Sequence, residues 1–390
     1  MPNPIYDRLF APLIDMSSSL FLAPVDEAAI SGTEFLAMVH RAAGALRARG
    51  VRAGDRVAVQ VAKTPEALAV YGATAAVGAI FLPLNTAYTA VEVDYFVGDA
   101  APALLLVDPA RADSLVPIAA AHGAKLSTLG ADGRGSFRDL CDAQTDVFAV
   151  EHRDDDDLVA LLYTSGTTGR SKGAMLTHAN LLSNAEALAR EWRFTSHDVL
   201  LHALPIFHTH GLFVATNVAL LSGASMLFLS GFDLDAILRS LPRATVLMGV
   251  PTFYTRLLEA PRFDRVLCER MRLFVSGSAP LLAETHVAFE ARTGHRILER
   301  YGMTETNMNT TNPYDGERRA GTVGLPLPGV EVIVADPDTG APLSAGETGV
   351  VEVRGPNVFK GYWRMPEKTR EDFRDNGFFI TGDLGCFSDH

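Results

Sequence analysis

Between two regular segments the chain carries the stretch Tyr163-Thr164-Ser165-Gly166-Thr167-Thr168-Gly169-Arg170-Ser171-Lys172-Gly173. Its glycines allow the backbone to approach a ligand closely, its hydroxyls and amides donate hydrogen bonds, and Arg170 and Lys172 add positive charge. The apolar residues 158–163 predict a buried strand ahead of the loop, and residues 176–192 predict a helix behind it. A solvated Gly/Ser/Thr loop is the plain alternative. The combination between strand and helix favours a loop that binds phosphate.

Two better-known phosphate loops are excluded by spacing. A Walker A loop ends in Gly-Lys-Ser/Thr, so that the lysine meets the phosphates and the hydroxyl meets Mg²⁺. Here Ser171 precedes Lys172 and Gly173 follows it. No Gly-x-Gly-x-x-Gly opens an early strand, which excludes a Rossmann dinucleotide site. The loop therefore indicates a nucleotide enzyme of another kind.

The composition fits a large globular protein with small-molecule ligands. The 390 residues are 48% hydrophobic and the net charge is -12, with a pI near 5.4. Such a charge argues against a nucleic-acid surface or a polybasic membrane patch, so an anionic ligand must meet locally placed cations. Cys141, Cys268 and Cys386 are far apart and form no metal-ligand pattern, which favours the reducing cytoplasm. We expect no secretion signal, transit peptide, membrane span or obligate protein partner.

Helical and strand patterns alternate along most of the chain. Apolar spacing predicts helices at 33–49, 65–78, 91–97, 178–192, 211–221, 233–240 and 281–292. It predicts strands at 56–62, 81–84, 103–107, 158–163, 199–203, 225–229, 245–249 and 272–277. This alternation predicts an α/β fold with two doubly wound, mainly parallel lobes, residues 1–157 and 158–320. Residues 321–390, rich in Gly, Pro, Val and Glu, predict a small antiparallel β-barrel subdomain.

Four further segments stand just after predicted strands, where open α/β sheets bind ligands. They are Pro205 to Gly211 (PIFHTHG), Val275 to Leu281 (VSGSAPL), Glu299 to Thr306 (ERYGMTET) and Ile380 to Gly385 (ITGDLG). With the first loop, they resemble in order the core motifs of the AMP-forming acyl-CoA synthetase, luciferase and adenylation superfamily. The resemblance covers nearly the whole chain.

The resemblance implies a role for each matching residue in an ATP and Mg²⁺ site. By this resemblance, residues 164–172 bind the pyrophosphate part of ATP. They include Thr164, Ser165, Gly166, Thr167, Thr168, Gly169 and Lys172. Adenine is lined by Ser278, Ala279 and Pro280 and stacks on Tyr301, which Gly302 follows. Thr304 touches the α-phosphate, Glu305 with Thr164 serves the metal, and Asp383 accepts from the ribose hydroxyls.

The chemistry of adenylation suits these residue types. A carboxylate that attacks the α-phosphorus builds negative charge on oxygen, so Mg²⁺ on Glu305 and donors from Thr304 and Thr164 stabilise that charge. Each residue alone has a plainer interpretation. Tyr301 could be a core aromatic, Glu305 a first-turn residue of a helix and Asp383 a turn residue. Only the ensemble favours the active site.

Within the superfamily, the segment around Arg300 and the pair of histidines resemble the malonyl-CoA synthetase branch. There the motif arginine binds the distal carboxylate of the acid, which assigns this role to Arg300. The resemblance places four further residues around the acid: His208, His210, Ser276 and Met303. A structural salt bridge of Arg300 with Glu299 or Glu305 is the alternative. Thr209, between the histidines, receives no role.

The resemblance implies that malonate and ATP give malonyl-adenylate, and that CoA then displaces AMP to give malonyl-CoA. Methylmalonate differs by one methyl group, worth about 1–3 kcal/mol of discrimination, so the two acids are not separated. Residues for CoA are not assigned. Another adenylate-forming enzyme, for a short-chain or amino acid, and a non-catalytic ATP-binding remnant remain alternatives.

The superfamily continues past its Thr-Gly-Asp motif into a smaller C-terminal domain with a catalytic lysine. The printed sequence ends seven residues after Asp383 without a recognisable hinge motif. We expect this domain to be absent and both half-reactions to be weakened for that reason.

Overall fold

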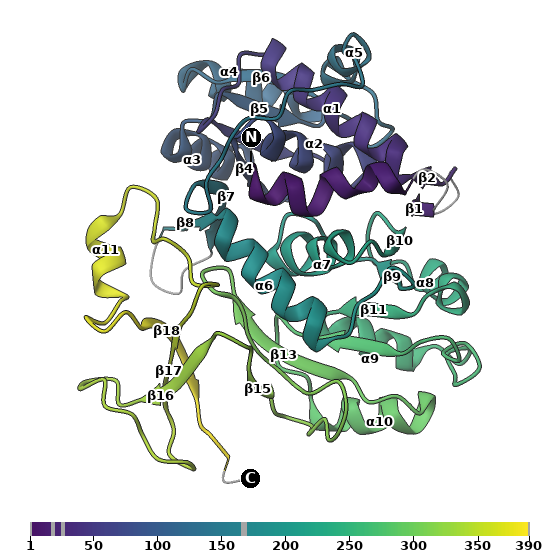
Figure 1. The fold of residues 1–390 in the computed structure, drawn as a ribbon, viewed down its shortest axis with the longest axis vertical. Helices are drawn as coiled ribbons and strands as arrows, with labels where there is room; N and C mark the ends of the chain where they lie inside the picture. Colours follow the sequence, from purple (N-terminus) through teal and green to yellow (C-terminus); the bar gives the residue numbers. More distant parts are fainter. Residues whose placement is uncertain (1, 17–19, 25–27, 165–169, 389–390) are drawn as a thin grey trace.

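The computed structural model describes residues 2–16, 20–24, 28–164 and 170–388. Two large sheets with helices around them make up most of the molecule, and a small sheet near the C-terminus lies beside them (Figure 1). The predicted α/β class with two mainly parallel lobes is confirmed. In Figure 1 the lobe with the six-stranded sheet is above and the lobe with the nine-stranded sheet is below.

The six-stranded sheet lies in the first lobe. Its order is β6 (Lys125–Thr128), β5 (Leu104–Val107), β3 (Arg56–Gln60), β4 (Ile80–Pro83), β7 (Leu158–Thr164) and β8 (Lys172–Thr177). All neighbours are parallel except β7 and β8. The lobe's helices are α1 (Gly32–Ala48), α2 (Pro65–Ala76), α3 (Ala90–Ala100), α4 (Ala112–Ala121) and α5 (Ser136–Asp142). Strands β3, β4 and β5 are almost wholly buried, which suits the apolar runs that predicted them.

The nine-stranded sheet forms the second lobe. Its order is β15 (Leu325–Pro326), β14 (Asn307–Thr311), β13 (Leu298–Met303), β12 (Leu273–Ser276), β11 (Val246–Gly249), β9 (Val199–His202), β10 (Ser225–Phe228), β1 (Leu20–Pro24) and β2 (Ile30–Ser31). From β13 to β1 the neighbours are parallel, and the strands beyond both ends pair antiparallel. Its helices are α6 (His178–Glu191), η4 (His210–Thr216), α7 (Asn217–Leu221), α8 (Leu234–Ser240), α9 (Pro251–Glu259) and α10 (Ala283–Thr293).

The phosphate loop joins two strands, so the predicted strand-to-helix passage is wrong. Residues 172–177 form β8, which pairs with β7 from the register partners Thr164 and Lys172 onward. The helix α6 begins only at His178, because Thr177 caps it: its hydroxyl accepts from the Asn180 amide at 3.1 Å. The apolar residues of β8 belong to a buried strand and not to the first turn of the helix.

The C-terminal part contains an antiparallel sheet of three strands: β16 (Glu331–Ala335), β17 (Gly349–Arg354) and β18 (Phe379–Gly385). Antiparallel pairing is confirmed, but the described residues of this part form an open sheet and not the predicted barrel. The helix α11 (Pro366–Glu371) lies between β17 and β18 in the chain. Residues 360–363 run along β8, where the Met175 amide donates to Gly361 at 3.0 Å and the Trp363 amide to Gly173 at 2.7 Å.

The predicted lobe boundary between residues 157 and 158 precedes β7 and β8, which belong to the six-stranded sheet. Conversely, β1 and β2 come from the first part of the chain and lie in the nine-stranded sheet. The sheets therefore exchange segments across the boundary. The division of the chain at 157 and 320 stays a prediction.

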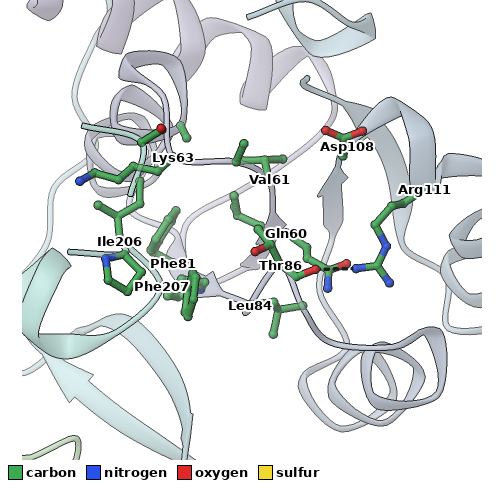
Figure 2. A pocket seen from close by; sticks show the side chains of 16 residues that line it. Gln60, Val61, Lys63, Phe81, Leu84, Thr86, Asp108, Arg111, Ile206 and Phe207 are labelled. Atoms are coloured by element: carbon green, nitrogen blue, oxygen red, sulfur yellow. Dashed lines mark hydrogen bonds between the residues drawn. The ribbon is translucent and has the colours of Figure 1, made fainter. Parts of the chain in front are cut away.

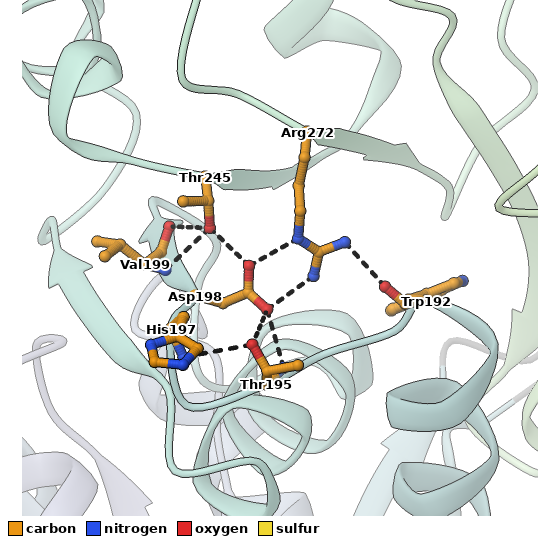
Figure 3. Close-up of polar contacts among 7 residues, drawn as sticks. All are labelled: Trp192, Thr195, His197, Asp198, Val199, Thr245 and Arg272. Atoms are coloured by element: carbon orange, nitrogen blue, oxygen red, sulfur yellow. Dashed lines mark hydrogen bonds and ion pairs between the residues drawn. The ribbon is translucent and has the colours of Figure 1, made fainter.

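An ion pair between the buried Asp198 and the half-buried Arg272 joins the amino ends of three strands in the second lobe (Figure 3). The Asp198 carboxylate accepts from the Arg272 guanidinium at 2.7 and 2.8 Å, from the Thr245 hydroxyl at 2.8 Å and from the Thr195 amide at 2.9 Å. Arg272 also donates to the Trp192 carbonyl at 2.9 Å, just after α6. Burial acts to raise the pKa of Asp198, but these hydrogen bonds outweigh it and hold that pKa below its ordinary value.

Asp198→Ala leaves Arg272 without its carboxylate, and we expect it to lower the free energy of unfolding by about 3–5 kcal/mol. Asp235→Ala, which breaks the exposed pair of Asp235 with Arg262, is the matched control and should cost at most about 1 kcal/mol. Urea unfolding at pH 7 measures both. Because the folded pKa of Asp198 is lowered, its contribution is present at neutral pH and is lost as the pH falls through that pKa. Equal effects of the two substitutions would contradict the assignment.

Candidate active site

The two ends of the phosphate loop lie at the edge of the six-stranded sheet. Thr164 ends β7 and Lys172 begins β8 opposite it. The Thr164 hydroxyl oxygen is buried and has no hydrogen-bond partner in the described part of the chain. A buried hydroxyl without a partner is costly, and a ligand oxygen would satisfy it. The predicted phosphate ligands Ser165, Gly166, Thr167, Thr168 and Gly169 lie outside the described residues.

Lys172 is connected to Glu305 through Tyr362. The Lys172 ammonium lies 4.4 Å from the centre of the Tyr362 ring and 3.7 Å from an Asp372 carboxylate oxygen. The Tyr362 hydroxyl donates to Glu305 Oε1 at 3.1 Å. Burial raises the pKa of Glu305, and the hydrogen bond from Tyr362 and the charge of Lys172 partly oppose that rise. The phosphate lysine and the predicted metal ligand thus belong to one contact network.

The oxygen atoms of Glu305 and Thr164 are suitable ligands for Mg²⁺. This ion prefers oxygen ligands and is usually held by one or two carboxylates together with substrate phosphates. Glu305 offers a carboxylate of which Oε1 is already oriented by Tyr362, and Thr164 offers an unpartnered hydroxyl. Over the described ranges, no three His, Cys, Asp or Glu side chains come together as a metal site. The phosphates of a nucleotide would therefore complete the coordination.

Tyr301 and Asp383 come together from two different sheets. Tyr301 lies on β13, Asp383 lies on β18, and the Tyr301 hydroxyl donates to Asp383 Oδ2 at 2.6 Å. Burial and the bond to Asp383 both raise the pKa of Tyr301. The predicted nucleoside residues are therefore neighbours, with Asp383 exposed. The expectation that these motifs follow strands is wrong, because residues 298–303 and 379–385 are themselves strands.

The backbone around the predicted adenine site is tightly constrained. Ser278 has a φ of +69°, and Ala279 and Pro280 follow it as exposed residues. A side chain on Gly302 would place Cβ 1.9 Å from the Asn307 carbonyl oxygen, so only glycine fits there. Non-glycine residues at positive φ cluster at functional sites. Thr304 is half-buried, with no side-chain hydrogen bond within the described ranges.

Arg300 is buried, and two nitrogen atoms of its guanidinium have no hydrogen-bond partner in the described part of the chain. Its exposed fraction is 3%, and its Nε and Nη2 have no hydrogen-bond partner within the described residues. No carboxylate of that part of the chain forms an ion pair with it, so the alternative salt bridge with Glu299 or Glu305 is not formed. Burial lowers the pKa of Arg300 to about 9, which still leaves it positively charged at neutral pH.

His210 lies near this arginine. It is buried, and its Nδ1 lies 3.3 Å from the Ser278 hydroxyl while its Nε2 has no partner in the described ranges. Burial and the positive charge of Arg300 hold the pKa of His210 well below its ordinary value, so the ring is neutral at pH 7. Arg300 and His210 therefore present unpaired nitrogen atoms in one buried region, which an anionic ligand group would satisfy.

The other predicted acid ligands are placed less closely. The register pairs Ser276 with Glu299, so Ser276 faces the same side of the sheet as Glu299 and the opposite side from Arg300. Its buried hydroxyl lacks a partner among the described residues. His208 is exposed beside the Phe207 ring, and Met303 is half-buried. Their contact with the acid stays a prediction.

A cavity of about 380 Å³ opens between the lobes at the carboxyl ends of β3, β4 and β5 (Figure 2). Loop 205–207, which begins the histidine motif, closes one side of it. Arg111 reaches across the mouth and donates to the Thr86 carbonyl at 3.1 Å. The residues that line the cavity are Val59, Gln60, Val61, Ala62, Lys63, Ala67, Phe81, Pro83, Leu84, Thr86, Asp108, Arg111, Pro205, Ile206, Phe207 and Ser230. Carboxyl ends of parallel strands are the usual ligand side of such sheets.

The structure places Lys172 and Glu305 on either side of Tyr362, Tyr301 against Asp383, and His210 against Ser278. The profile of the family described as AMP-binding enzyme matches residues 19–363. The chain belongs to the AMP-binding enzyme family. Each motif of the site except the Thr-Gly-Asp segment lies within the matched range of this family member.

Several relatives are malonate ligases by name. The malonate–CoA ligase of Arabidopsis thaliana is 36% identical over 354 residues, and the match covers 85% of this chain and 58% of that ligase. The chain thus spans less than two thirds of that relative. MatB from Rhodopseudomonas palustris with ATP bound is 56% identical with a TM-score of 0.96, over 100% of this chain and 77% of that one. A malonyl-CoA ligase with methylmalonyl-CoA and AMP bound is 36% identical with a TM-score of 0.81, over 98% and 79%.

These matches confirm the predicted likeness to the adenylate-forming superfamily and to its malonyl-CoA synthetase branch.

Across the described ranges, no helix is both long and apolar enough to cross a membrane. The three cysteines are free. The cytoplasmic compartment stays a prediction.

Gly277 lies against the Arg300 guanidinium, which packs where a side chain at position 277 would be. The sequence alone does not reveal this contact. A Cβ at Gly277 would lie 2.4 Å from the Arg300 guanidinium carbon. We expect Gly277→Ala to overpack this buried region and to lower the free energy of unfolding by about 1–3 kcal/mol. Gly231→Ala, where a Cβ meets nothing within 4 Å, is the control and should change it by at most about 0.5 kcal/mol. Urea unfolding compares the two, and equal changes would show that Arg300 is free to move aside.

Proposed function

We propose that this protein activates a small dicarboxylic acid, malonate, with ATP, and transfers the product to CoA. Malonate and ATP give malonyl-AMP and pyrophosphate, and CoA then gives malonyl-CoA and AMP. The observation that carries the proposal is Arg300, a buried cation without a carboxylate partner in the described residues. Methylmalonate is the nearest alternative substrate, since a methyl group changes binding by only about 1–3 kcal/mol.

The acid end of the site suits a second carboxylate. A guanidinium binds a carboxylate through two parallel hydrogen bonds, and Arg300 has both Nε and Nη2 free for them. A monocarboxylic fatty acid would leave this buried cation facing a methyl group, which is costly. A dicarboxylic acid satisfies the cation with its distal carboxylate and leaves the other carboxylate for reaction.

The nucleotide end suits the adenylation step. Lys172 and the Thr164 hydroxyl would bind the phosphates, Tyr301 would offer a face to the purine, and Asp383 would accept from the ribose. When bound, Mg²⁺ would supply positive charge at the phosphate oxygens, with Glu305 and Thr164 as its protein ligands. The attack of the carboxylate on the α-phosphorus builds charge beside Thr304 and Lys172, which would stabilise it in place.

The direct test is ATP–pyrophosphate exchange with malonate, methylmalonate, acetate and a long-chain fatty acid. We expect exchange with the two dicarboxylic acids and background rates with the monocarboxylic acids. Preference for acetate or a fatty acid would assign another acyl-CoA synthetase, and ATP binding without exchange would assign a nucleotide-binding protein.

Arg300→Gln keeps a polar side chain but removes the charge that the distal carboxylate needs. We expect kcat/KM for malonate to fall on the order of 100-fold, because truncating a buried charge pair costs about 2–5 kcal/mol. The ATP dissociation constant, measured by calorimetry, should stay the same. Arg239→Gln on α8, an exposed arginine, is the control and should change neither quantity. Undiminished malonate activation in Arg300→Gln would rule out this pocket.

Asp372→Asn removes the carboxylate that competes with nucleotide phosphates for Lys172. We expect it to tighten ATP binding about two- to fivefold, since partly exposed pairs contribute about 1 kcal/mol or less. AMP, which lacks the outer phosphates, should bind as before. Glu371→Gln is the control, because the neighbouring Glu371 carboxylate pairs with Lys368 at 3.3 Å, whereas Lys172 pairs with Asp372. Weaker ATP binding in Asp372→Asn would mean that the carboxylate only positions the lysine.

A further inference from the structure

Lys63 is a buried lysine on the wall of the cavity between the lobes. Its exposed fraction is 9%, and its ammonium lies 4.3 Å from the centre of the Phe228 ring. It follows β3 of the six-stranded sheet, yet its hydrogen bonds go to His202, the last residue of β9 in the other lobe. Lys63 Nζ donates to the His202 carbonyl at 2.8 Å and to His202 Nδ1 at 2.9 Å. Figure 2 shows Lys63 beside Ile206, at the end of the cavity where the histidine motif begins.

The His202 ring connects Lys63 to Gly211, the last residue of the histidine motif. His202 Nε2 lies 2.9 Å from the carbonyl oxygen of Gly211, which can only accept, so Nε2 carries the proton. Nδ1 of the neutral ring is then an acceptor, which is what the Lys63 ammonium requires. Lys63 at Nδ1 and the Gly211 carbonyl at Nε2 therefore stabilise the same tautomer of His202, and His202 links Lys63 to the Gly211 carbonyl.

The Gly211 carbonyl lies in a backbone segment with an unusual geometry. Residues 210–216 form η4, a π-helix, which is rare and is found frequently at functional sites. Gly211 O accepts from the Thr216 hydroxyl at 2.9 Å as well as from His202. A Cβ at Gly211 would lie 2.0 Å from the Pro205 carbonyl oxygen, so only glycine lets this backbone pack so closely against Pro205. His210, whose free Nε2 belongs to the Arg300 region, immediately precedes this anchored peptide.

We propose that Lys63 is a positioning residue for the acid site. Through His202 it anchors the Gly211 peptide and so sets where His210 stands relative to Arg300 and Ser278. The inference rests on the proposed function, because the acid that His210 meets is the one assigned there. It extends the acid site to a residue of the other lobe, which acts on the acid through His202 and the Gly211 peptide.

The test uses Lys63→Met, which keeps the length and apolar stem of the side chain but removes its donor. We expect the KM for malonate in ATP–pyrophosphate exchange to rise on the order of tenfold, about 1.4 kcal/mol, with the KM for ATP unchanged. Lys125→Met is the matched control, because Lys125 is an exposed lysine of the same lobe that donates to the Arg49 carbonyl. An equal rise in both KM values, or no rise, would overturn the proposal.

Thr216→Val is the second variant, because it removes the other donor to Gly211 without disturbing the buried ammonium. We expect a smaller rise in the malonate KM alone, and a combined effect with Lys63→Met that differs from the product of the two. Should Lys63→Met fail to fold, Thr216→Val alone decides, and an unchanged malonate KM would overturn the proposal.

Nitrogen chemical shifts of the histidine rings give a readout that needs no activity. We expect Lys63→Met to shift the His202 and His210 ring signals and Lys125→Met to leave them in place; unshifted His210 signals would overturn the anchor. A wild-type protein that shows no exchange with any acid would count against the proposed function alone, because the ring signals still test the anchor.

Discussion

A guanidinium that is almost fully buried and has free donors is the constraint around which the acid end of this site is arranged. Water normally compensates such a charge, and here the strand β13 carries Arg300 out of its reach. Position 277, just after the neighbouring strand β12, is a glycine, because a Cβ there would lie 2.4 Å from the Arg300 guanidinium carbon and would force that side chain to move. Burial, together with the charge of Arg300, lowers the pKa of His210 and keeps its ring neutral. The local sequence, the register of β12 with β13 and the charge state of the histidine all accommodate one cation.

The two lobes and the C-terminal part of the molecule meet beside the antiparallel strands β7 and β8. Strand β8 is the edge strand of the six-stranded sheet, and residues 360–363 hydrogen-bond along it. Tyr362 in that segment contacts Lys172 and Glu305, which come from β8 and from the turn between β13 and β14. The site therefore depends on packing between units that are distant in sequence, and no single lobe contains it.

The sequence predicted what local patterns determine. Alternating apolar runs predicted both mainly parallel lobes, and the resemblance of the motifs to the superfamily singled out Tyr301, Glu305, Arg300 and Asp383. It missed what depends on distant pairing. Residues 172–177 were not predicted as a strand, and they form one by pairing antiparallel with β7. Tyr362, Asp372, Gly277 and Lys63 lie outside the motif ligands, and their contacts arise from tertiary packing.

The Asp198–Arg272 pair and the ligand site occupy opposite edges of the same parallel sheet: one ties together the amino ends of β9, β11 and β12, and the other lies past the carboxyl ends of β9 and β12. The groups that hold the strands in place are thus spatially separate from those proposed to choose the acid. Substitutions at the carboxyl edge can therefore change the proposed acid site while the ion pair at the opposite edge of the sheet stays intact.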